Sequence, residues 1–150
     1  MSWGSSGPAV FAALVAKFQQ IELNGEVRDG PSPGDAAARE VITVGYVGPD
    51  DDSSAENTSQ SGGLGTRDRE QYSVQCACSV LSGDEEVGPT RVRVFELLAA
   101  CGQQLALDPK LGGACMKASI RQWTLREDMT GGGVFALVRF DVGVEAFTTP

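Results

Sequence analysis

The sequence predicts an α+β fold, in which two amphipathic helices pack on a mainly antiparallel β-sheet. Three observations support this fold class. Two segments carry apolar residues at helical spacing, one segment alternates apolar and polar residues, and two further alternating segments flank a run of glycines. The chain has 150 residues, of which 41% are hydrophobic and 21% charged, as in one globular domain. We therefore expect residues 1–150 to form a single domain.

The longer predicted helix begins near Gly88 and ends at Leu107. Pro89 is tolerated in the first turn, because the N–H that it lacks would have no partner there. The helix ends before Asp108-Pro109, since the residue that precedes a proline is disfavoured in the α region. Its apolar stripe requires a sheet or another helix to cover it, and consists of Val94, Phe95, Leu98, Cys101, Gly102 and Leu105.

The amino-terminal segment predicts the second helix. Residues 1–7 are rich in glycine and serine, and we expect them to form a flexible leader. From Pro8 to about Leu23 the apolar residues recur at helical spacing, and Asn24-Gly25 follows as a stop signal. The stripe of this shorter helix consists of Phe11, Leu14, Val15, Phe18 and Ile21.

Strands are predicted in three places before the long helix. Residues 27–29 are at most a short piece of strand, and 40–47 resemble a strand that is covered on both faces. Residues 70–81 form the clearest strand, because one of its faces is apolar throughout. That face consists of Tyr72, Val74, Cys76, Cys78 and Val80.

A carboxy-terminal hairpin is predicted from 114–127 and 134–147, joined by a glycine-rich loop at 128–133. In the favoured register the numbers of paired residues sum to 262. This register makes three favourable cross-strand pairs, which are Arg121 with Asp141, Lys117 with Glu145, and Trp123 with Arg139.

Residues 48–68 predict a long acidic loop. It contains three consecutive aspartates and Leu64 as its one large apolar side chain. Such a segment buries too little apolar surface to offset the entropy of ordering. A loop of this length in a compact domain is either functional or disordered.

Composition excludes several classes of function. The net charge of −8 and the pI near 4.4 argue against a protein that binds phosphates through a basic surface. We expect no affinity for duplex DNA. Apolar runs fall short of the roughly 20 residues of a membrane span, and a basic segment followed by an apolar one is missing at the start. We therefore expect a soluble protein that no signal peptide exports.

Side chains that carry chemistry are few. The sequence has no histidine, which removes the commonest general base and the commonest metal ligand. The four cysteines lack the paired spacing of a zinc site and are interpreted as small buried hydrophobes with free thiols. Asp50-Asp51-Asp52 resembles the start of a calcium loop, but Ser54 and Ala55 stand where a ligand and a glycine belong. We predict no catalytic, cofactor-binding or metal-binding residues.

Several short motifs occur in a fixed order along the chain. After the first helix come Val-Arg-Asp-Gly-Pro at 27–31, Glu-Val-Ile-Thr-Val-Gly-Tyr at 40–46, Arg-Glu-Gln-Tyr-Ser-Val at 69–74, Ser-Val-Leu-Ser-Gly-Asp at 79–84, Arg-Val-Phe-Glu-Leu-Leu-Ala at 93–99, Asp-Pro-Lys-Leu-Gly-Gly at 108–113 and the hairpin. In this order they resemble the tail-terminator, or neck, proteins of long-tailed bacteriophages, particularly of actinobacterial phages. The resemblance covers nearly the whole chain.

The resemblance implies a structural virion protein that is made in the cytoplasm of the host bacterium. Such proteins form a ring, usually a hexamer, at the head-proximal end of the tail tube. The ring ends polymerisation of the tube and joins it to head-completion proteins, while genomic DNA passes through its lumen. The implied partners are therefore other copies of the chain, the tail tube protein and a head-completion protein, without a membrane.

Under this resemblance we expect the loop to have a role in assembly. It should lie against a neighbouring copy or the adjacent tube ring, with Asp50, Asp51 and Asp52 toward the lumen or a basic partner surface. Arg67 and Arg69 would anchor its base. A negative lumen suits the passage of DNA, because phosphates slide along it without binding.

Two alternatives remain open. One is a different phage structural role, such as a head-completion or tube protein. The other is an enzyme or small-ligand binder on an α+β scaffold, which would show a pocket with converging polar groups and perturbed pKa values.

Overall fold

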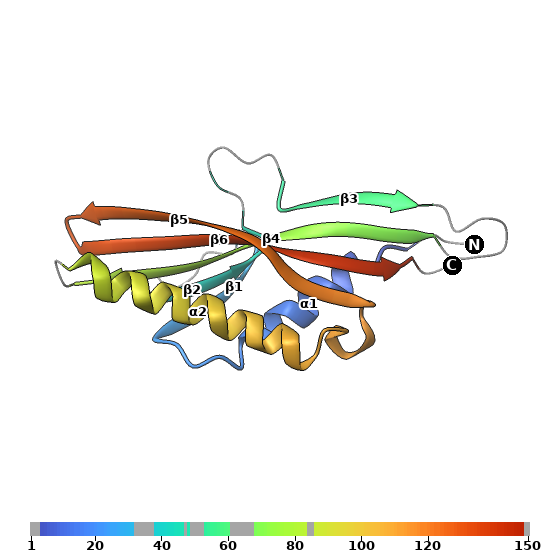
Figure 1. The fold of residues 1–150 in the computed structure, drawn as a ribbon, viewed down its shortest axis with the longest axis horizontal. Coiled ribbons are helices and arrows are strands. Elements are labelled where there is room, and N and C mark those ends of the chain that lie inside the picture. The colour runs from blue at the N-terminus through green and yellow to red at the C-terminus, as the bar shows by residue number, and fades with distance from the viewer. Residues whose placement is uncertain are drawn as a thin grey trace.

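The chain folds into one sheet with two helices on one face (Figure 1). The computed structural model describes residues 4–31, 38–46, 48, 53–60, 68–83 and 86–148, and only the backbone of 56–60. The elements in chain order are α1 (Gly7–Phe18), β1 (Gly25–Asp29), β2 (Glu40–Val44), β3 (Ala55–Gln60), β4 (Arg69–Ser82), α2 (Val87–Leu107), the 3₁₀ turn η1 (Leu111–Gly113), β5 (Lys117–Thr130) and β6 (Gly133–Phe147).

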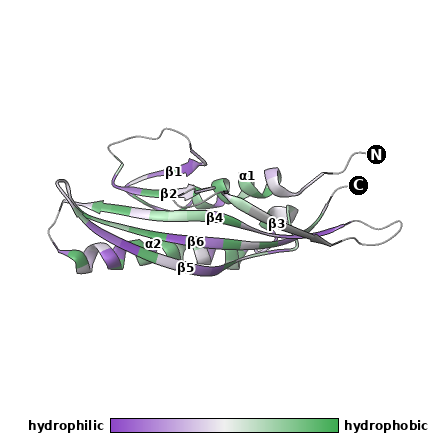
Figure 2. Ribbon diagram, turned by 90° about the horizontal axis from the view of Figure 1, so that it is seen from above, coloured by the Kyte–Doolittle hydropathy of each residue, from purple (hydrophilic) through white to green (hydrophobic). Residues whose placement is uncertain are grey.

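The strands lie in the order β1-β2-β4-β6-β5, which Figure 2 shows from above. β1 and β2 are parallel, and the other strand pairs are antiparallel. β2 and β3 share one side of β4, with β2 along its carboxy-terminal half and β3 along its amino-terminal half. The predicted mainly antiparallel α+β fold is therefore confirmed.

The core lies between the sheet and the helices. Alternate residues of β4 and β6 face the helices and are almost fully buried, as the alternation at 70–81 predicted. The opposite face of the sheet carries mostly polar side chains. All four cysteines are buried, as predicted, and the Sγ atoms of Cys78 and Cys101 lie 3.9 Å apart as thiols.

The two helices differ in how well the sequence located them. α2 ends at Leu107, the residue that the following Asp108-Pro109 predicted. The expectation that α1 extends to about Leu23 is wrong, because α1 ends at Phe18. The N–H groups of Gln20 and Ile21 donate to the carbonyls three residues earlier, which tightens the chain into a turn. Ile21 is half-buried against the core, so it continued the apolar pattern beyond the helix.

Part of the predicted flexible leader is tied to the sheet by Glu70. This glutamate of β4 is fully buried, and its carboxylate accepts hydrogen bonds from the Ser5 hydroxyl, the Ser6 N–H and the Ser6 hydroxyl at 2.7–3.1 Å. The Ser6 hydroxyl also lies 2.8 Å from the Tyr72 hydroxyl, whose pKa burial raises to about 12. Ser5 and Ser6 are thus held by a buried carboxylate, while residues 1–3 lie outside the described part.

Two short strands depart from the expectations. Residues 27–29, expected to be at most a short piece of strand, belong to the longer β1, which pairs along its whole length with β2. The predicted loop at 48–68 contains β3, which pairs with β4 residues Arg69–Val74. Apart from Ala55, β3 consists of polar residues, so no alternation of apolar and polar side chains marks it in the sequence. Its pairing depends on the backbone groups that β4 leaves open.

The hairpin register is correct over one half and wrong over the other. Lys117 pairs with Glu145 as predicted, but a β-bulge at Arg121 shifts the register by one from Gln122 onward. The predicted pairs of Arg121 with Asp141 and of Trp123 with Arg139 are therefore wrong. The Arg121 side chain lies over Gly143, where a Cβ would clash with it. As a result Trp123 pairs with the buried Phe140 and lies on the helix-covered face of the sheet.

Candidate functional site

The predicted assembly residues fall mainly outside the described part of the chain. Asp50, Asp51, Asp52 and Arg67 lie there, so their expected roles stay predictions. Arg69 is the first residue of β4, and its Nη2 lies 3.7 Å from Glu145 Oε2 on β6. Its expected role as an anchor of the loop also stays a prediction.

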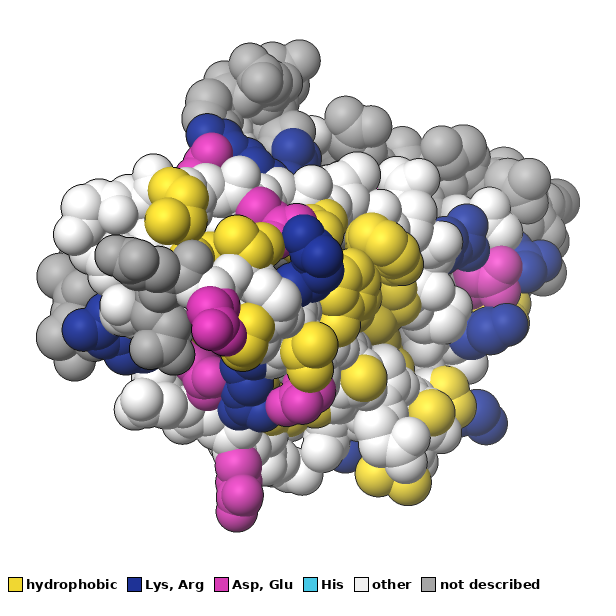
Figure 3. Space-filling view, turned by 60° about the vertical axis from the view of Figure 1, so that its left-hand side comes forward, with side chains coloured by type: hydrophobic (Ala, Val, Ile, Leu, Met, Phe, Trp, Pro, Cys, Tyr) yellow, Lys and Arg dark blue, Asp and Glu magenta, His cyan; other side chains and the backbone are white. Residues whose placement is uncertain are grey.

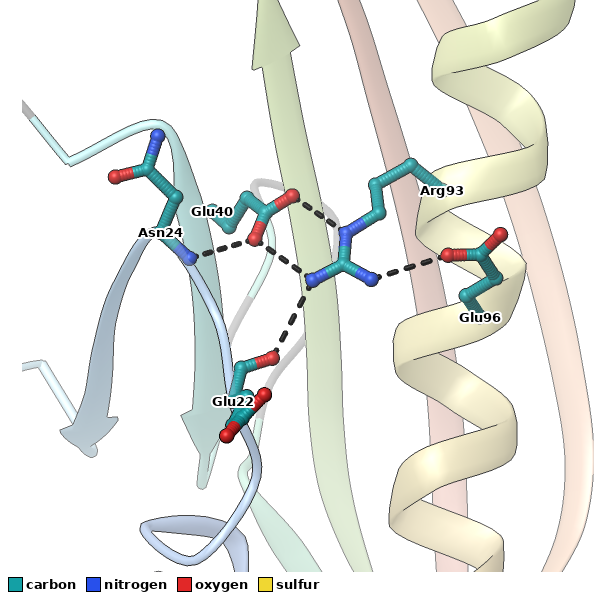
Figure 4. Close-up of polar contacts among 5 residues, drawn as sticks. All are labelled: Glu22, Asn24, Glu40, Arg93 and Glu96. Carbon is teal, nitrogen blue, oxygen red and sulfur yellow. Dashed lines mark hydrogen bonds and ion pairs between the residues drawn. The ribbon is translucent and has the colours of Figure 1, made fainter.

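The flank of α2 that faces β2 is polar, and its polar groups bond to other groups of the same chain. Arg93 donates from Nε to Glu40 Oε2 at 2.6 Å and from Nη2 to Glu40 Oε1 at 3.0 Å (Figure 4). The same guanidinium contacts Glu96 and the Glu22 carbonyl, and the Asn24 N–H donates to Glu40 at 2.7 Å. Only 11% of the Glu40 side chain is exposed. The polar groups of this flank are thus satisfied within one copy of the chain.

The pKa values of this cluster reflect a stable ion pair. The hydrogen bond from Arg93 lowers the pKa of Glu40 below its ordinary value, and the hydrogen bond to Glu40 raises that of Arg93. Both shifts favour the charged forms at neutral pH. A general acid or base would instead need a pKa moved toward neutrality. Glu40 and Arg93 therefore connect α2 to β2 as a structural pair.

The side of α2 that is turned toward β5 and the solvent is apolar and open. Val92, Phe95 and Ala99 follow one another at spacings of three and four residues along it. Trp123 and Met129 lie beside it on β5. We call these five residues the α2–β5 surface. Val92 is 59% exposed, Trp123 51% and Met129 62%, which is unusual for side chains of this size.

Two contacts fix the α2–β5 surface. The rings of Phe95 and Trp123 meet edge to face, with their centroids 4.9 Å apart. One helical turn away, Arg91 Nε donates to Glu127 Oε1 at 3.0 Å, and this ion pair joins α2 to β5. The ring contact holds the indole across the seam between helix and strand, with half of its area exposed. A large aromatic side chain held in this way suits a binding surface.

The edge of the sheet beside this surface is long. β5 has 14 residues, and among the described strands it pairs only with β6. Most of its side chains are exposed. Its single bulge and its charged side chains Lys117, Arg121 and Arg126 are devices that protect such an edge from unspecific pairing.

Apolar side chains also gather in the middle of one face of the molecule, between charged ones (Figure 3).

Hollows also occur between described residues. One, of about 570 Å³, lies at the carboxyl ends of β1 and β2, with Phe11, Arg28, Thr43 and Tyr46 among its lining residues. A second, of about 390 Å³, contains Glu40 and Arg93. A third, of about 190 Å³, is lined by Gln75, Gln122, Trp123, Thr124, Arg139 and Asp141.

Comparison of the chain with protein-family models and with curated proteins finds no match. Within the described part of the chain, no three or more Cys, Asp or Glu residues cluster as a metal site would require. Among the same residues, the helices are too short or too polar to cross a membrane.

Sequence reasoning missed the α2–β5 surface. It placed Trp123 opposite Arg139 on the other face of the sheet, because the bulge at Arg121 leaves no trace in the alternation. One signal was present on α2. Val92 and Ala99 stand on the side opposite the buried stripe, where a helix that faces only water normally carries charged residues.

Proposed function

We propose that this chain is a structural subunit of a long-tailed phage, which forms a closed ring at the head-proximal end of the tail tube. In this role it ends tube polymerisation and joins the tail to head-completion proteins. The observation that carries the proposal is the α2–β5 surface, an exposed aromatic and aliphatic strip on one side of an acidic protein. Such strips mark protein–protein contacts in soluble proteins.

The position of this surface favours a ring over a simple pair. It lies at one edge of the sheet, at β5, while the edge formed by β1 has different side chains. A ring requires two different patches on each copy, whereas a twofold dimer uses the same patch twice. The order of short motifs from Val27 to Gly113 supports the phage role, and the structural use of Glu40 and Arg93 fits a protein without catalysis.

The net charge of the chain supports a negative lumen. Six of the 20 acidic residues lie outside the described part, namely Asp35, Asp50, Asp51, Asp52, Asp84 and Glu85. Of the 12 basic residues, only Arg67 lies outside it. Most of the net charge of −8 therefore belongs to these segments. An acidic protomer repeated around the proposed ring gives the lumen a negative field, so that DNA passes without binding.

The test combines mass measurement with imaging. Native mass spectrometry of the purified chain should give one closed species, with six copies expected. Antibodies against the chain, applied to actinobacterial phage particles that encode it, should label the junction of head and tail. The matched pair of variants is Val92→Glu, which should abolish the ring, and Leu107→Glu, which should leave it intact.

The control is well matched because Leu107 is also an exposed apolar residue of α2, with 70% of its area exposed. It lies about 22 Å farther along the helix, at 1.5 Å per residue. A chain that stays monomeric at all concentrations would contradict the proposal. Label along the whole tail, with open stacks of the purified chain, would instead identify a tube protein.

The enzyme or ligand-binding alternative rests on the hollow of about 570 Å³. Its volume lies in the range of about 300–1,000 Å³ that is typical of ligand pockets. Among the described residues that line it, Arg28 is the only charged one, so the hollow lacks the converging acidic and nucleophilic groups of a catalytic site. We therefore favour the structural role.

A further inference from the structure

We infer that the α2–β5 surface of one copy docks on the β1 edge of a second copy, over the hollow that Phe11 and Tyr46 line. This inference rests on the proposed function and names the two surfaces that meet in each contact of the ring. The occupant of the hollow is thus a part of the same chain, and the contact is of the heterologous kind.

The two surfaces lie at opposite edges of one sheet. β1 and β5 are the first and last strands in the order β1-β2-β4-β6-β5. α1 packs beside β1 on the same face on which α2 packs beside β5 (Figure 1). A copy that presents its β5 side to the β1 side of the next copy leaves its own β1 side for a third. Repetition of this contact closes a ring or continues as a helix.

The charges of the two edges are complementary. On β5, Glu127 is paired with Arg91 and Asp128 with Arg126, beside the further cations Lys117 and Arg121. On β1, Arg28 is paired with Glu26, beside the further anion Asp29. β5 is therefore net positive and β1 net negative. Contact between two β5 edges would bring like charges together, as would contact between two β1 edges. The charges thus select the β5–β1 pairing over a twofold dimer.

The shapes are complementary as well. The α2–β5 surface projects a half-exposed indole and two exposed aliphatic side chains, Val92 and Met129. The hollow at the ends of β1 and β2 is lined by the rings of Phe11 and Tyr46 together with polar groups. Arg139 lies over the Tyr46 ring, 5.7 Å from its centroid, which holds that ring in place. A hollow of about 570 Å³ can hold an indole with neighbouring side chains.

The experiment is a complementation test with two defective variants. Val92→Glu puts a charge on the α2–β5 surface, and Thr43→Arg fills the hollow, which Thr43 lines from the open face of β2. Each variant alone should be monomeric by native mass spectrometry at about 20 μM. Its dissociation constant for self-association should be more than tenfold higher than that of the wild type. Mixed in equal amounts, they should form a one-to-one dimer and nothing larger, because only one pair of intact surfaces remains.

Circular dichroism spectra equal to the wild type establish that both variants are folded. A photocrosslinking residue at position 129 gives an independent readout, and its crosslinks should map to α1 and β1 of another copy. If the wild type forms a ring and Thr43→Arg forms the same ring, the inference is overturned and the proposed function stands. Crosslinks from position 129 to residues 92–99 or 123–129 of another copy would overturn it in the same way. A wild type that forms no assembly would overturn both.

Discussion

The two flanks of α2 differ in whether their side chains find partners within the protomer. On the flank toward β2, Arg93 and Glu40 form an ion pair whose hydrogen bonds are completed by Asn24 and Glu22 of the same chain (Figure 4). On the flank toward β5, the exposed side chains Val92 and Trp123 are apolar and bury only part of their area. The first flank needs no partner, and the second leaves apolar surface in water.

This difference makes the two flanks separable by mutation. A buried polar group must find its hydrogen bonds inside the protomer, because the cost of leaving it unsatisfied is paid on folding. Exposed apolar area costs little in the folded protomer and gains free energy when another protein covers it. Substitutions on the β2 flank should therefore change the free energy of unfolding, and substitutions on the β5 flank should change association.

The largest effect is expected from Glu40→Ala. The change leaves the Arg93 guanidinium with its exposed partner Glu96 and removes the acceptor of the Asn24 N–H. We expect the free energy of unfolding to fall by about 2 kcal/mol, below the range for fully buried pairs because 36% of the Arg93 side chain is exposed. Urea unfolding of the monomeric Val92→Glu background measures this change without interference from assembly.

Glu96→Ala is the matched control for this prediction. Glu96 bonds the same guanidinium at 3.0 Å, but its side chain is 55% exposed. Exposed ion pairs contribute about 0.2–1 kcal/mol. Equal losses in the two variants would show that burial of Glu40 does not set its contribution, and the contrast between the flanks would fail.

Trp123→Ala should act mainly on association. In the protomer it removes the edge-to-face contact with Phe95, which contributes about 1 kcal/mol. In the assembly it also removes the largest side chain of the α2–β5 surface. We expect association to weaken at least tenfold, or about 1.4 kcal/mol per contact. Sedimentation at several concentrations measures this loss, and a variant that assembles like the wild type would exclude Trp123 from the contact.

The pH dependence of the unfolding free energy should show the contribution of the ionised Glu40 on the β2 flank. The pKa of Glu40 in the folded chain lies below its ordinary value of 4.5, because Arg93 and the Asn24 N–H stabilise the carboxylate. The resulting stability is present above pH 4.5 and is lost as the pH falls through the folded-state pKa. The difference in unfolding free energy between wild type and Glu40→Gln should therefore be largest near neutral pH and shrink in acid.

This comparison isolates Glu40 from Asp108, whose pKa the hydrogen bond from Lys17 also lowers. Asp108 is present in both proteins, so its contribution cancels in the difference. A difference that stays constant from pH 7 to pH 3 would mean that Glu40 gains nothing from ionisation in the folded state.

Local patterns predicted the elements that pack by their own side chains. The strict alternation around Tyr72 and Val80 located β4, and Asp108-Pro109 located the end of α2. Both signals depend on residues close together in the sequence. These local signals also predict the main features of the fold. A sheet with one apolar face must have that face covered, and the two helices have the apolar stripes that can cover it.

The remaining features depend on partners distant in the sequence. β3 forms because the amino-terminal half of β4 offers it backbone groups, and no side-chain period marks it. The bulge at Arg121 depends on the missing Cβ of Gly143, which lies on the paired strand. Since that bulge decides which face Trp123 occupies, the α2–β5 surface could not be located from the alternation alone.

The smallest expected effect concerns Gly102, on the β5 flank of α2. A Cβ at this position would lie 3.6 Å from Ile120 Cδ1, an ordinary contact distance, so alanine fits without displacement. Glycine inside a helix costs about 0.5–1 kcal/mol relative to alanine. Gly102→Ala should therefore raise the free energy of unfolding by about that amount and leave association unchanged. Gly112→Ala is the control, because Gly112 has a φ of 68° that alanine adopts only with strain, so the same substitution there should destabilise. If Gly102→Ala stabilised the protomer but weakened association, a neighbouring copy would have to approach the α2 backbone at Gly102, and the contact would extend along the helix beyond Ala99.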